Sequence, residues 1–375
     1  MPDAGTDALA AYLAHPYATD DGVVARLAQV CDPAQAGEEP HVAVWREYAA
    51  RARAVGVLPA LAESLVQLRF PIRAGISQED AYAAATRRGR FDAADAFVRD
   101  IGSGGLVLER PDLLTLTFTD GVAGTLPLLI AGTRRDFETL VRAFTERNEP
   151  RDVPASMGAC FVKGLNNWDR VARYRRAWES ANGTEGDDEA WREEMSRFAA
   201  QKSRYQDRFV ILSRGPYSGV AGHDVGQSES EWLERSLVIR AEHELTHDLT
   251  WRLFAIVRSH ATDEIVADYV GLVRAFGYYP DAIARRLLGI DDLPRFRPGG
   301  RLENYKGTPA LDDRQFARVC ALAADATRQL AAVSARHADR LVETPFLTRL
   351  VYALSLSSLT ELADSSLAAQ IDARL

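Results

Sequence analysis

Hydrophobic positions recur at three- and four-residue spacing along most of the chain and form short continuous runs only in its middle. The first pattern is typical of amphipathic helices and covers most of residues 1–100 and 231–375. The short runs, rich in aliphatic and β-branched residues, indicate strands at 106–109, 113–119, 124–132, 159–163 and 208–213. This pattern predicts an α+β fold that is predominantly helical, with a small antiparallel sheet.

We expect three regions along the chain. Residues 1–100 are predicted to form an N-terminal helical region, residues 101–213 a mixed α/β region with short strands, and residues 214–375 a second helical region. Within the last of these, residues 291–311 break the helical pattern for an unusually long stretch. Connections of that length in a compact domain are usually functional or mobile.

Composition narrows the class of protein. The 375 residues are 47% hydrophobic and 26% charged, which is ordinary for a soluble globular protein. A net charge of −8 argues against sequence-independent binding of nucleic acid. The chain also lacks the run of about 18 apolar residues that a membrane-spanning helix needs. The three cysteines lie far apart and the N-terminal segment has no continuous apolar stretch. We therefore expect a cytoplasmic protein without a disulfide framework.

The informative segment is a helical stretch, residues 236–254, with an HExxH pattern at residues 243–247. Residues four apart lie on one helix face with Cβ atoms about 5–6 Å apart, so His243 and His247 can bind a single metal ion. Glu244 is rotated about 100° from His243 and reaches the water on the ion rather than the ion itself. The alternative is a helix whose two histidines are ordinary core or surface groups.

The next helical segment, residues 259–277, offers a third ligand. Thr262 is a natural N-cap, and Glu264 follows in the first turn. A catalytic zinc keeps three protein ligands and one open position, and Glu264 is placed to complete the set. Asp268, one turn further, faces the same way and can accept the second ring N–H of a ligating histidine. Without a metal, the helix dipole explains acids in a first turn, and a solvated helix face explains Asp268.

With HELTH followed by DEIVAD, residues 242–270 resemble the gluzincin metallopeptidases, whose pattern is HExxH and then a glutamate and an aspartate four residues apart on the next helix. Asp263 stands where many members have asparagine. The resemblance implies a zincin-like helix pair and a Zn²⁺ cofactor within residues 214–375. The matching residues are the zinc ligands His243, His247 and Glu264, the general base Glu244, and Asp268, which orients a ligand.

The resemblance also implies a hydrolase that cleaves peptide bonds with zinc-activated water and Glu244 as the general base. Such enzymes commonly place a tyrosine or histidine, well after the third ligand, where it stabilises the oxyanion. They also bind extended substrates beside an edge strand, and we expect residues 208–213 and the loop 215–219 near that cleft. The candidates for the oxyanion donor are Tyr278, Tyr279, Tyr305 and His337, with Arg301 as a cationic option.

Other polar residues have simpler interpretations. His260, just before the second helix, is predicted to be a local capping or solvent residue, and His223 in a glycine-rich loop is predicted to be exposed. The unusual run at residues 166–169, Asn-Asn-Trp-Asp, is typical of a helix cap with an aromatic anchor.

Three functions are compatible with these residues. The first is a zinc metallopeptidase acting on peptides, and the second is a zinc-dependent enzyme that acts on a small molecule in a biosynthetic pathway. The third is a non-catalytic zincin-like binding protein, because a fold does not determine a function. The expected partner is a peptide or small-molecule substrate, and the oligomeric state is left open.

Overall fold

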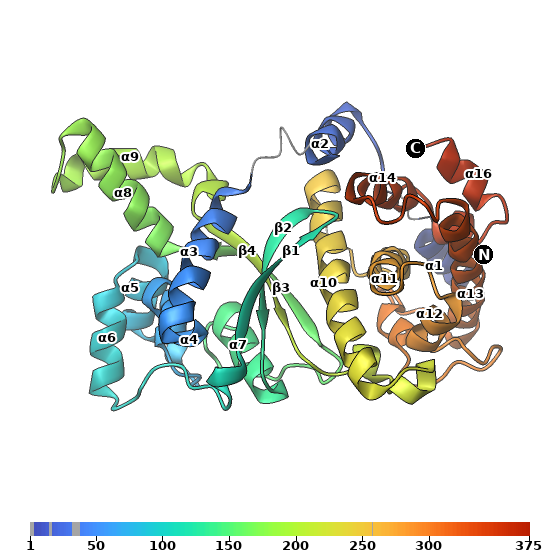
Figure 1. The fold of residues 1–375 in the computed structure, drawn as a ribbon, viewed down its shortest axis with the longest axis horizontal. Coiled ribbons are helices and arrows are strands. Elements are labelled where there is room, and N and C mark those ends of the chain that lie inside the picture. Colours follow the sequence, from blue (N-terminus) through green and yellow to red (C-terminus); the bar gives the residue numbers. More distant parts are fainter. Residues whose placement is uncertain (1–3, 15–16, 32–37, 257) are drawn as a thin grey trace. The chain divides into compact units, whose positions relative to one another are not determined.

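The computed structural model describes residues 4–14, 17–31, 38–256 and 258–375, with the backbone alone for residues 4–7 (Figure 1). The chain forms two compact units. Unit 2 gives way to unit 1 between Arg214 and Gly215, and the expected division into three regions stays a prediction. The expected N-terminal region is divided between the units. Unit 1 consists of Met1–Gly37, Asp120–Gly124 and Gly215–Leu375, and unit 2 of Glu38–Thr119 and Thr125–Arg214.

The fold is α+β and predominantly helical, as the sequence predicts. Unit 1 contains the helices α1 (Ala4–Leu13), α2 (Asp21–Cys31), α10 (Glu229–Phe254), α11 (Ala261–Phe276), α12 (Asp281–Leu288), α13 (Asp313–Arg336), α14 (Thr344–Ser355), α15 (Leu359–Leu362) and α16 (Leu367–Asp372). Unit 2 contains α3 (Pro40–Val55), α4 (Val57–Ser64), α5 (Asp80–Arg88), α6 (Phe91–Asp100), α7 (Arg134–Thr145), α8 (Trp168–Asn182) and α9 (Asp188–Ala199). The short 3-10 helices are η1 (Val66–Arg69), η2 (Ile76–Gln78), η3 (Pro111–Leu113), η4 (Lys202–Arg204), η5 (Tyr217–Gly219), η6 (Gly222–Val225) and η7 (Arg301–Tyr305). No helix in the described part of the chain is both long enough and apolar enough to cross a membrane.

The strands that the structure describes form a four-stranded sheet in the order β1-β2-β4-β3. They are β1 (Thr115–Gly121), β2 (Gly124–Ile130), β3 (Ala159–Asn166) and β4 (Gln206–Leu212). A two-residue turn makes β1 and β2 antiparallel, and β3 is antiparallel to β4. β2 and β4 run parallel, with Leu128 opposite Val210, so the sheet is mixed rather than wholly antiparallel as expected. The chain passes through α7, β3, α8 and α9 between β2 and β4, which gives it the length to return in the same direction.

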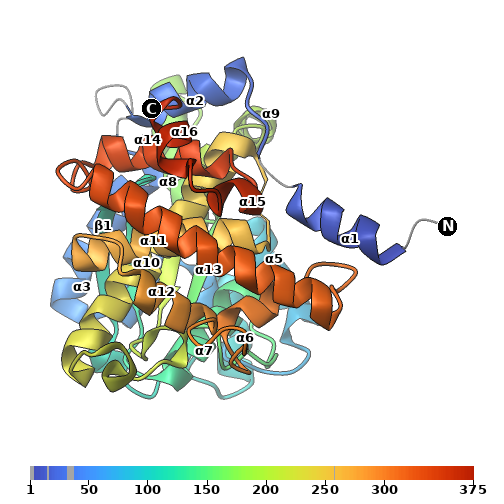
Figure 2. The same cartoon turned by 90° about the vertical axis from the view of Figure 1, so that its right-hand side faces the viewer.

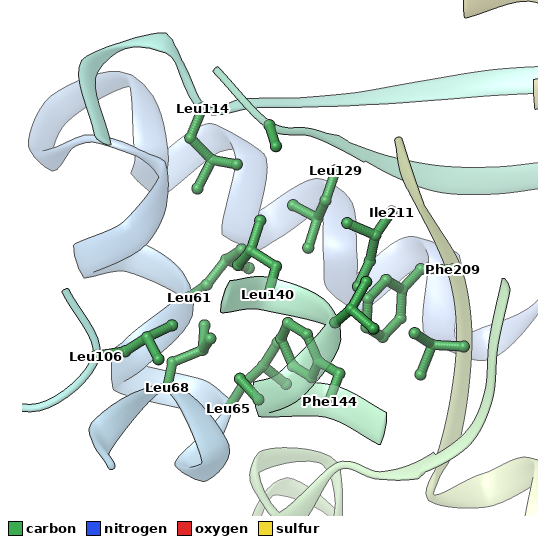
Figure 3. Packing of buried hydrophobic residues seen from close by; sticks show 14 of the residues in the cluster. Leu61, Leu65, Leu68, Leu106, Leu114, Leu129, Leu140, Phe144, Phe209 and Ile211 are labelled. Carbon is green, nitrogen blue, oxygen red and sulfur yellow. The ribbon is translucent and has the colours of Figure 1, made fainter. Parts of the chain in front are cut away.

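The main hydrophobic core of unit 2 is built on β4 (Figure 3). Phe209 and Ile211 alternate along the strand and therefore share one face, which packs with residues of α3, α4 and α7. The ring centroids of Trp45 and Phe144 lie 4.6 and 5.0 Å from that of Phe209. Since Phe209 is fully buried, its truncation to alanine would cost about 3–5 kcal/mol.

A buried carboxylate, Asp207, connects this core to α8. It accepts hydrogen bonds from Trp45 Nε1 at 2.8 Å, Asn167 Nδ2 at 2.6 Å and Arg170 Nη1 at 2.6 Å. The side chain of Asn167 also caps the first turn of α8, and Trp168 Nε1 donates to a backbone carbonyl of α5 at 2.8 Å. The predicted cap and aromatic anchor at residues 166–169 are thus confirmed.

In unit 1, α10 and α11 pack side by side (Figure 1). They run antiparallel, because Ile239 lies against Gly271 whereas His247, later in α10, lies against Glu264, earlier in α11. A Cβ on Gly271 would lie 2.7 Å from the carbonyl oxygen of Ile239, so this close approach requires glycine. Helix α13 lies against α11 and α12 (Figure 2).

The start of α11 differs in detail from the prediction. The helix begins at Ala261, and its N-cap is His260, whose Nδ1 accepts a hydrogen bond from the Thr262 backbone N–H at 3.2 Å. The predicted Thr262 cap is therefore wrong, and local capping by His260 is confirmed. Because Nδ1 accepts, Nε2 of His260 carries the ring proton and donates to the carbonyl oxygen of Tyr12 at 3.0 Å.

Candidate metal centre

Helix α10 carries both histidines of the HExxH pattern on one face. It begins at a capping box in which Ser228 and Glu231 bind each other's backbone N–H groups, so the helix is fixed from its first turn. His243 and His247 lie one turn apart, with ring centroids separated by 4.6 Å and Nε2 atoms by 3.0 Å. Their two Nε2 atoms therefore converge on one point.

Helix α11 brings Glu264 to the same point. Its Oε2 lies 3.4 Å from His243 Nε2, and its Oε1 lies 3.4 Å from His247 Nε2. The structure thus brings together the three side chains that the sequence predicts to be ligands. Their ligand atoms all lie within 4.8 Å of one another, and this is the one such group of three or more in the described part of the chain.

These distances fit the coordination of a metal ion. Tetrahedral ligands at about 2.0–2.1 Å from an ion lie roughly 3.3–3.4 Å from each other. The separations here are 3.0, 3.4 and 3.4 Å. Two ring nitrogens this close to each other and to a carboxylate need a proton or a cation between them, so the group can hold a metal ion.

The charges at the group favour a cation. Burial alone would raise the pKa of Glu264, but hydrogen bonds with His243 and His247 outweigh it and hold that pKa well below its usual range. Burial alone would lower the pKa of His243, but hydrogen bonds with Asp268 and Glu264 outweigh it and raise that pKa to about 9. The two carboxylates therefore stabilise a positive charge here, carried by a proton or by a metal ion in its place.

Asp268 lies where the sequence predicts it. Its Oδ1 is 3.0 Å from His243 Nδ1 and accepts a hydrogen bond from the Tyr217 hydroxyl at 2.7 Å. The Arg301 guanidinium donates to Asp268 Oδ2 and to the Tyr217 hydroxyl oxygen, and it lies 3.8 Å from Glu264 Oε2. Burial would raise the pKa of Asp268, but the charge of Arg301 and the contact with His243 outweigh it and lower that pKa.

Glu244 does not belong to the group of three. Between Ala241 and Thr250, Glu244 and His247 are the two residues that are not fully buried, so they mark the accessible side of the segment. Among the described residues, the Glu244 carboxylate has no hydrogen-bond or ion-pair partner. Glu244 therefore lies on the helix that carries the histidines, and no described group is bonded to its carboxylate in a way that would prevent it from accepting a proton.

The long break in the helical pattern at residues 291–311 reaches this site. It contains η7, which supplies Arg301 and also Tyr305. Burial, followed by the charge of Glu264, raises the pKa of Tyr305 above its ordinary value, so the Tyr305 hydroxyl lies within the electrostatic reach of this ligand. The connection therefore reaches the candidate site through Arg301, and its role in a function stays a prediction.

The other candidate donors lie in different surroundings. Tyr278 is exposed. Tyr279 is buried with its ring centroid 5.0 Å from that of Tyr269. His337 Nε2 lies 3.1 Å from Asp372 Oδ1. Of the five candidates, Arg301 is thus the one with a contact to a ligand residue, and Tyr305 is the one tyrosine among them whose pKa the charge of Glu264 raises.

The remaining sequence predictions have mixed outcomes. His223 is exposed, as predicted. The loop 215–219 does reach the site, but the residue that matters in it, Tyr217, was not singled out, because a lone tyrosine in a glycine-rich loop carries no periodic signal. The expected cleft strand, β4, belongs to unit 2, and its role stays a prediction.

The helix pair and its histidine–histidine–glutamate group define a candidate metalloprotein. The chain belongs to the family described as "Family of unknown function (DUF7005)", whose model matches residues 5–366. Comparison with curated proteins finds no match, and comparison with solved structures finds none either. The family match includes the whole candidate site, and the description of the family assigns it no activity.

Proposed function

We propose that this protein is a zinc-dependent hydrolase of gluzincin type, most simply a metallopeptidase. The observation that carries the proposal is the triangle of ligand atoms from His243, His247 and Glu264, held by two packed helices. Two imidazoles and one carboxylate are a donor set of catalytic zinc, whereas structural zinc sites are closed by four protein ligands. A fourth position would therefore be open to water or substrate.

Each residue of the site would have a defined part in the reaction. Zinc bound here would supply Lewis acidity toward a substrate carbonyl and toward the attacking water. Glu244 would accept the proton of that water and pass it to the leaving group, because its carboxylate is accessible and without a competing partner. Asp268 would keep the proton of His243 on Nδ1, which leaves Nε2 as the ligand atom.

Tyr305 is our candidate for the donor that stabilises the oxyanion. The charge of Glu264 acts on its hydroxyl, and its raised pKa keeps that hydroxyl protonated at physiological pH. Arg301 is a weaker candidate, because its guanidinium already donates to Asp268 and Tyr217.

One observation favours a small-molecule substrate as a second candidate. A cavity of about 520 Å³ in unit 1 is lined by residues that include Arg258, His260 and Asn304. None of the three ligand residues lines this cavity, but His260 lies one helical turn before Glu264 and Asn304 precedes Tyr305 in the chain. A cavity of this size suits a compact ligand with a few polar groups better than an extended peptide.

We also infer that the protein acts in the cytoplasm. Its three cysteines all lie among the described residues and form no disulfide. Disulfides are typical of oxidising compartments and rare in the cytosol.

The test is digestion of an unbiased peptide library by the purified protein, with and without a chelator, for the wild type and Glu244→Gln. We expect the wild type to cleave and the chelator to abolish cleavage. Glu244→Gln should keep its zinc and lose turnover by about 10²–10⁴-fold, the range for a general base. Glu234→Gln, an exposed glutamate of the same helix, is the matched control and should leave turnover unchanged.

Unchanged turnover of Glu244→Gln would remove Glu244 as the base. If the wild type binds zinc but cleaves no peptide, peptidase activity is rejected, and the enzyme with a small-molecule substrate and the non-catalytic binding protein remain.

A further inference from the structure

One fully enclosed side chain at the site has no part in the reaction described above. Tyr217 is 5% exposed and lies in η5, in the loop before α10, yet its hydroxyl is in contact with Asp268, Arg301 and His243 Nδ1. We propose that Tyr217 is a positioning residue of the metal centre: with Arg301 it holds Asp268 in the one orientation that presents His243 to the ion. This inference rests on the proposed metal site.

The direction of each hydrogen bond supports the proposal. A guanidinium can only donate, so the Arg301–Tyr217 contact must run from the arginine N–H to the tyrosine oxygen. The single proton of the Tyr217 hydroxyl is then directed to Asp268 Oδ1, 2.7 Å away. His243 Nδ1 lies 3.0 Å from Asp268 Oδ1 and 3.2 Å from the Tyr217 hydroxyl oxygen. Since an ionised Asp268 accepts only and the Tyr217 proton is directed to Oδ1, both neighbours of Nδ1 are acceptors, so Nδ1 must be the protonated ring nitrogen.

This chain of donors has a consequence for the ligand. With the proton on Nδ1, the His243 lone pair lies on Nε2, the atom that faces His247 and Glu264. If the Tyr217 hydroxyl were lost, Oδ1 would keep the histidine as a neighbour but lose its shortest contact. The carboxylate could then rotate, and the imidazole with it.

The loop is attached to the helix that carries the histidines. The Tyr217 backbone N–H donates to Ser236 Oγ at 2.9 Å, and Arg240 donates to the carbonyl oxygens of Gly215 at 2.6 Å and Pro216 at 2.8 Å. Ser236 and Arg240 precede His243 by seven and three residues, so they lie on the same face of α10.

Local backbone geometry also favours a fixed loop. Ser218, the next residue, has a left-handed φ of 52°, a conformation that persists only where the surroundings hold it. The backbone at Tyr217 is therefore fixed by contacts independent of Asp268, and it determines where the ring and its hydroxyl are presented. This is what a positioning role requires, because the hydroxyl then directs the carboxylate rather than following it.

The test is the zinc affinity of Tyr217→Phe, measured by competition with a chromophoric chelator. The change keeps the ring and removes only the hydroxyl. We expect zinc binding weaker by about 10–100-fold, as is typical when the partner of a ligand is lost. The matched control is Tyr48→Phe in unit 2, whose buried hydroxyl also donates to an aspartate, Asp169, at 2.8 Å. It should leave zinc affinity unchanged.

Two further measurements separate positioning from simple packing. In ¹⁵N-histidine-labelled, zinc-loaded wild type, the His243 Nδ1–H should exchange slowly with solvent, and in Tyr217→Phe it should exchange faster while the melting temperature changes little. If Tyr217→Phe does not fold, Arg301→Lys decides, because a lysine cannot donate to Tyr217 and Asp268 in the planar geometry of arginine. It should weaken zinc binding in the same direction.

Zinc affinity and Nδ1–H exchange equal to those of the wild type would overturn the proposal. If instead the wild type itself binds no zinc, the proposed function fails first, and the proposal on Tyr217 fails with it. The two failures are distinguishable because the first appears only in the variants and the second in the wild type.

Discussion

Two glutamates of one helix show how environment assigns roles to identical side chains. Glu242 is buried, and its carboxyl has Arg274 Nε as its nearest cation at 3.8 Å. Burial raises the pKa of Glu242 to about 7, although the charge of Arg274 acts against it. Glu244, two residues on, is accessible and has no hydrogen-bond or ion-pair partner among the residues that the structure describes. Since a general base must reach water, Glu244 and not Glu242 is the one suited to proton transfer.

At the residue scale we predict that the seven histidines do not contribute equally to metal binding. His243→Ala should abolish zinc binding in a chelator competition, because it removes a ligand atom from the triangle. His260→Ala should change zinc affinity less than about threefold and lower stability by roughly 2 kcal/mol, since it removes an N-cap and the hydrogen bond to the Tyr12 carbonyl oxygen but no ligand atom. Equal effects of the two variants on zinc affinity would show that the ligand set is wrong.

At the scale of elements, the site depends on how closely α10 and α11 approach. The contact of Gly271 with the Ile239 carbonyl lies on the same helix pair as the ligands and sets the separation between the helix axes. Because Glu264 belongs to α11 and both histidines to α10, any change in that separation changes the ligand triangle directly.

We therefore predict that Gly271→Ala lowers stability by about 1–3 kcal/mol, despite the better helix propensity of alanine, and weakens zinc binding. Thermal unfolding and zinc titration measure the two effects. Gly22→Ala in α2 is the control, because its Cβ would meet only the flexible ends of Asp20 and Arg26. A Gly271→Ala protein as stable as Gly22→Ala, with unchanged zinc affinity, would show that the helix separation does not govern the site.

The sequence predicts elements and ligands better than it predicts the partners of the ligands. The helical period places His243 and His247 on one face, and the pattern on the next helix identifies Glu264 and Asp268. Tyr217 and Arg301 come from connections, and no local periodicity determines where a connection runs in space. The parallel pairing of β2 with β4 has a similar origin, since it follows from the long crossover between the strands rather than from the sequence of either strand.

At the scale of the molecule, the proposed chemistry lies wholly in unit 1, and unit 2 carries its own buried ionisable groups. His41, near the start of α3, is 2% exposed, with Nδ1 3.5 Å from Glu39. Burial lowers the pKa of His41 to about 4; the charge of Glu39 opposes this, and those of Arg208 and Arg170 add to it. The folded protein therefore keeps this histidine neutral at pH values where the unfolded chain protonates it.

His41 makes the folded protein less stable at acidic pH. Between about pH 6.5 and pH 4 the unfolded state binds more protons at His41 than the folded state. The free energy of unfolding therefore decreases as the pH decreases through that window, by on the order of 3 kcal/mol from this group alone. Urea denaturation at several pH values should show the difference between wild type and His41→Asn shrinking below pH 6.5. His223→Asn, at an exposed histidine, should show no such trend. If the difference in free energy of unfolding between wild type and His41→Asn stays constant from pH 6.5 to pH 4, His41 does not cause this pH dependence.

The most direct test of the central claim is zinc content combined with the zinc K-edge X-ray absorption spectrum of the purified protein after exhaustive dialysis. We predict one zinc per chain, bound by two imidazoles and a carboxylate at about 2.0–2.2 Å, with no sulfur ligand. The imidazole signal should be lost in His243→Ala. A wild type without zinc, or a spectrum with sulfur at about 2.3 Å, would contradict the assignment of His243, His247 and Glu264.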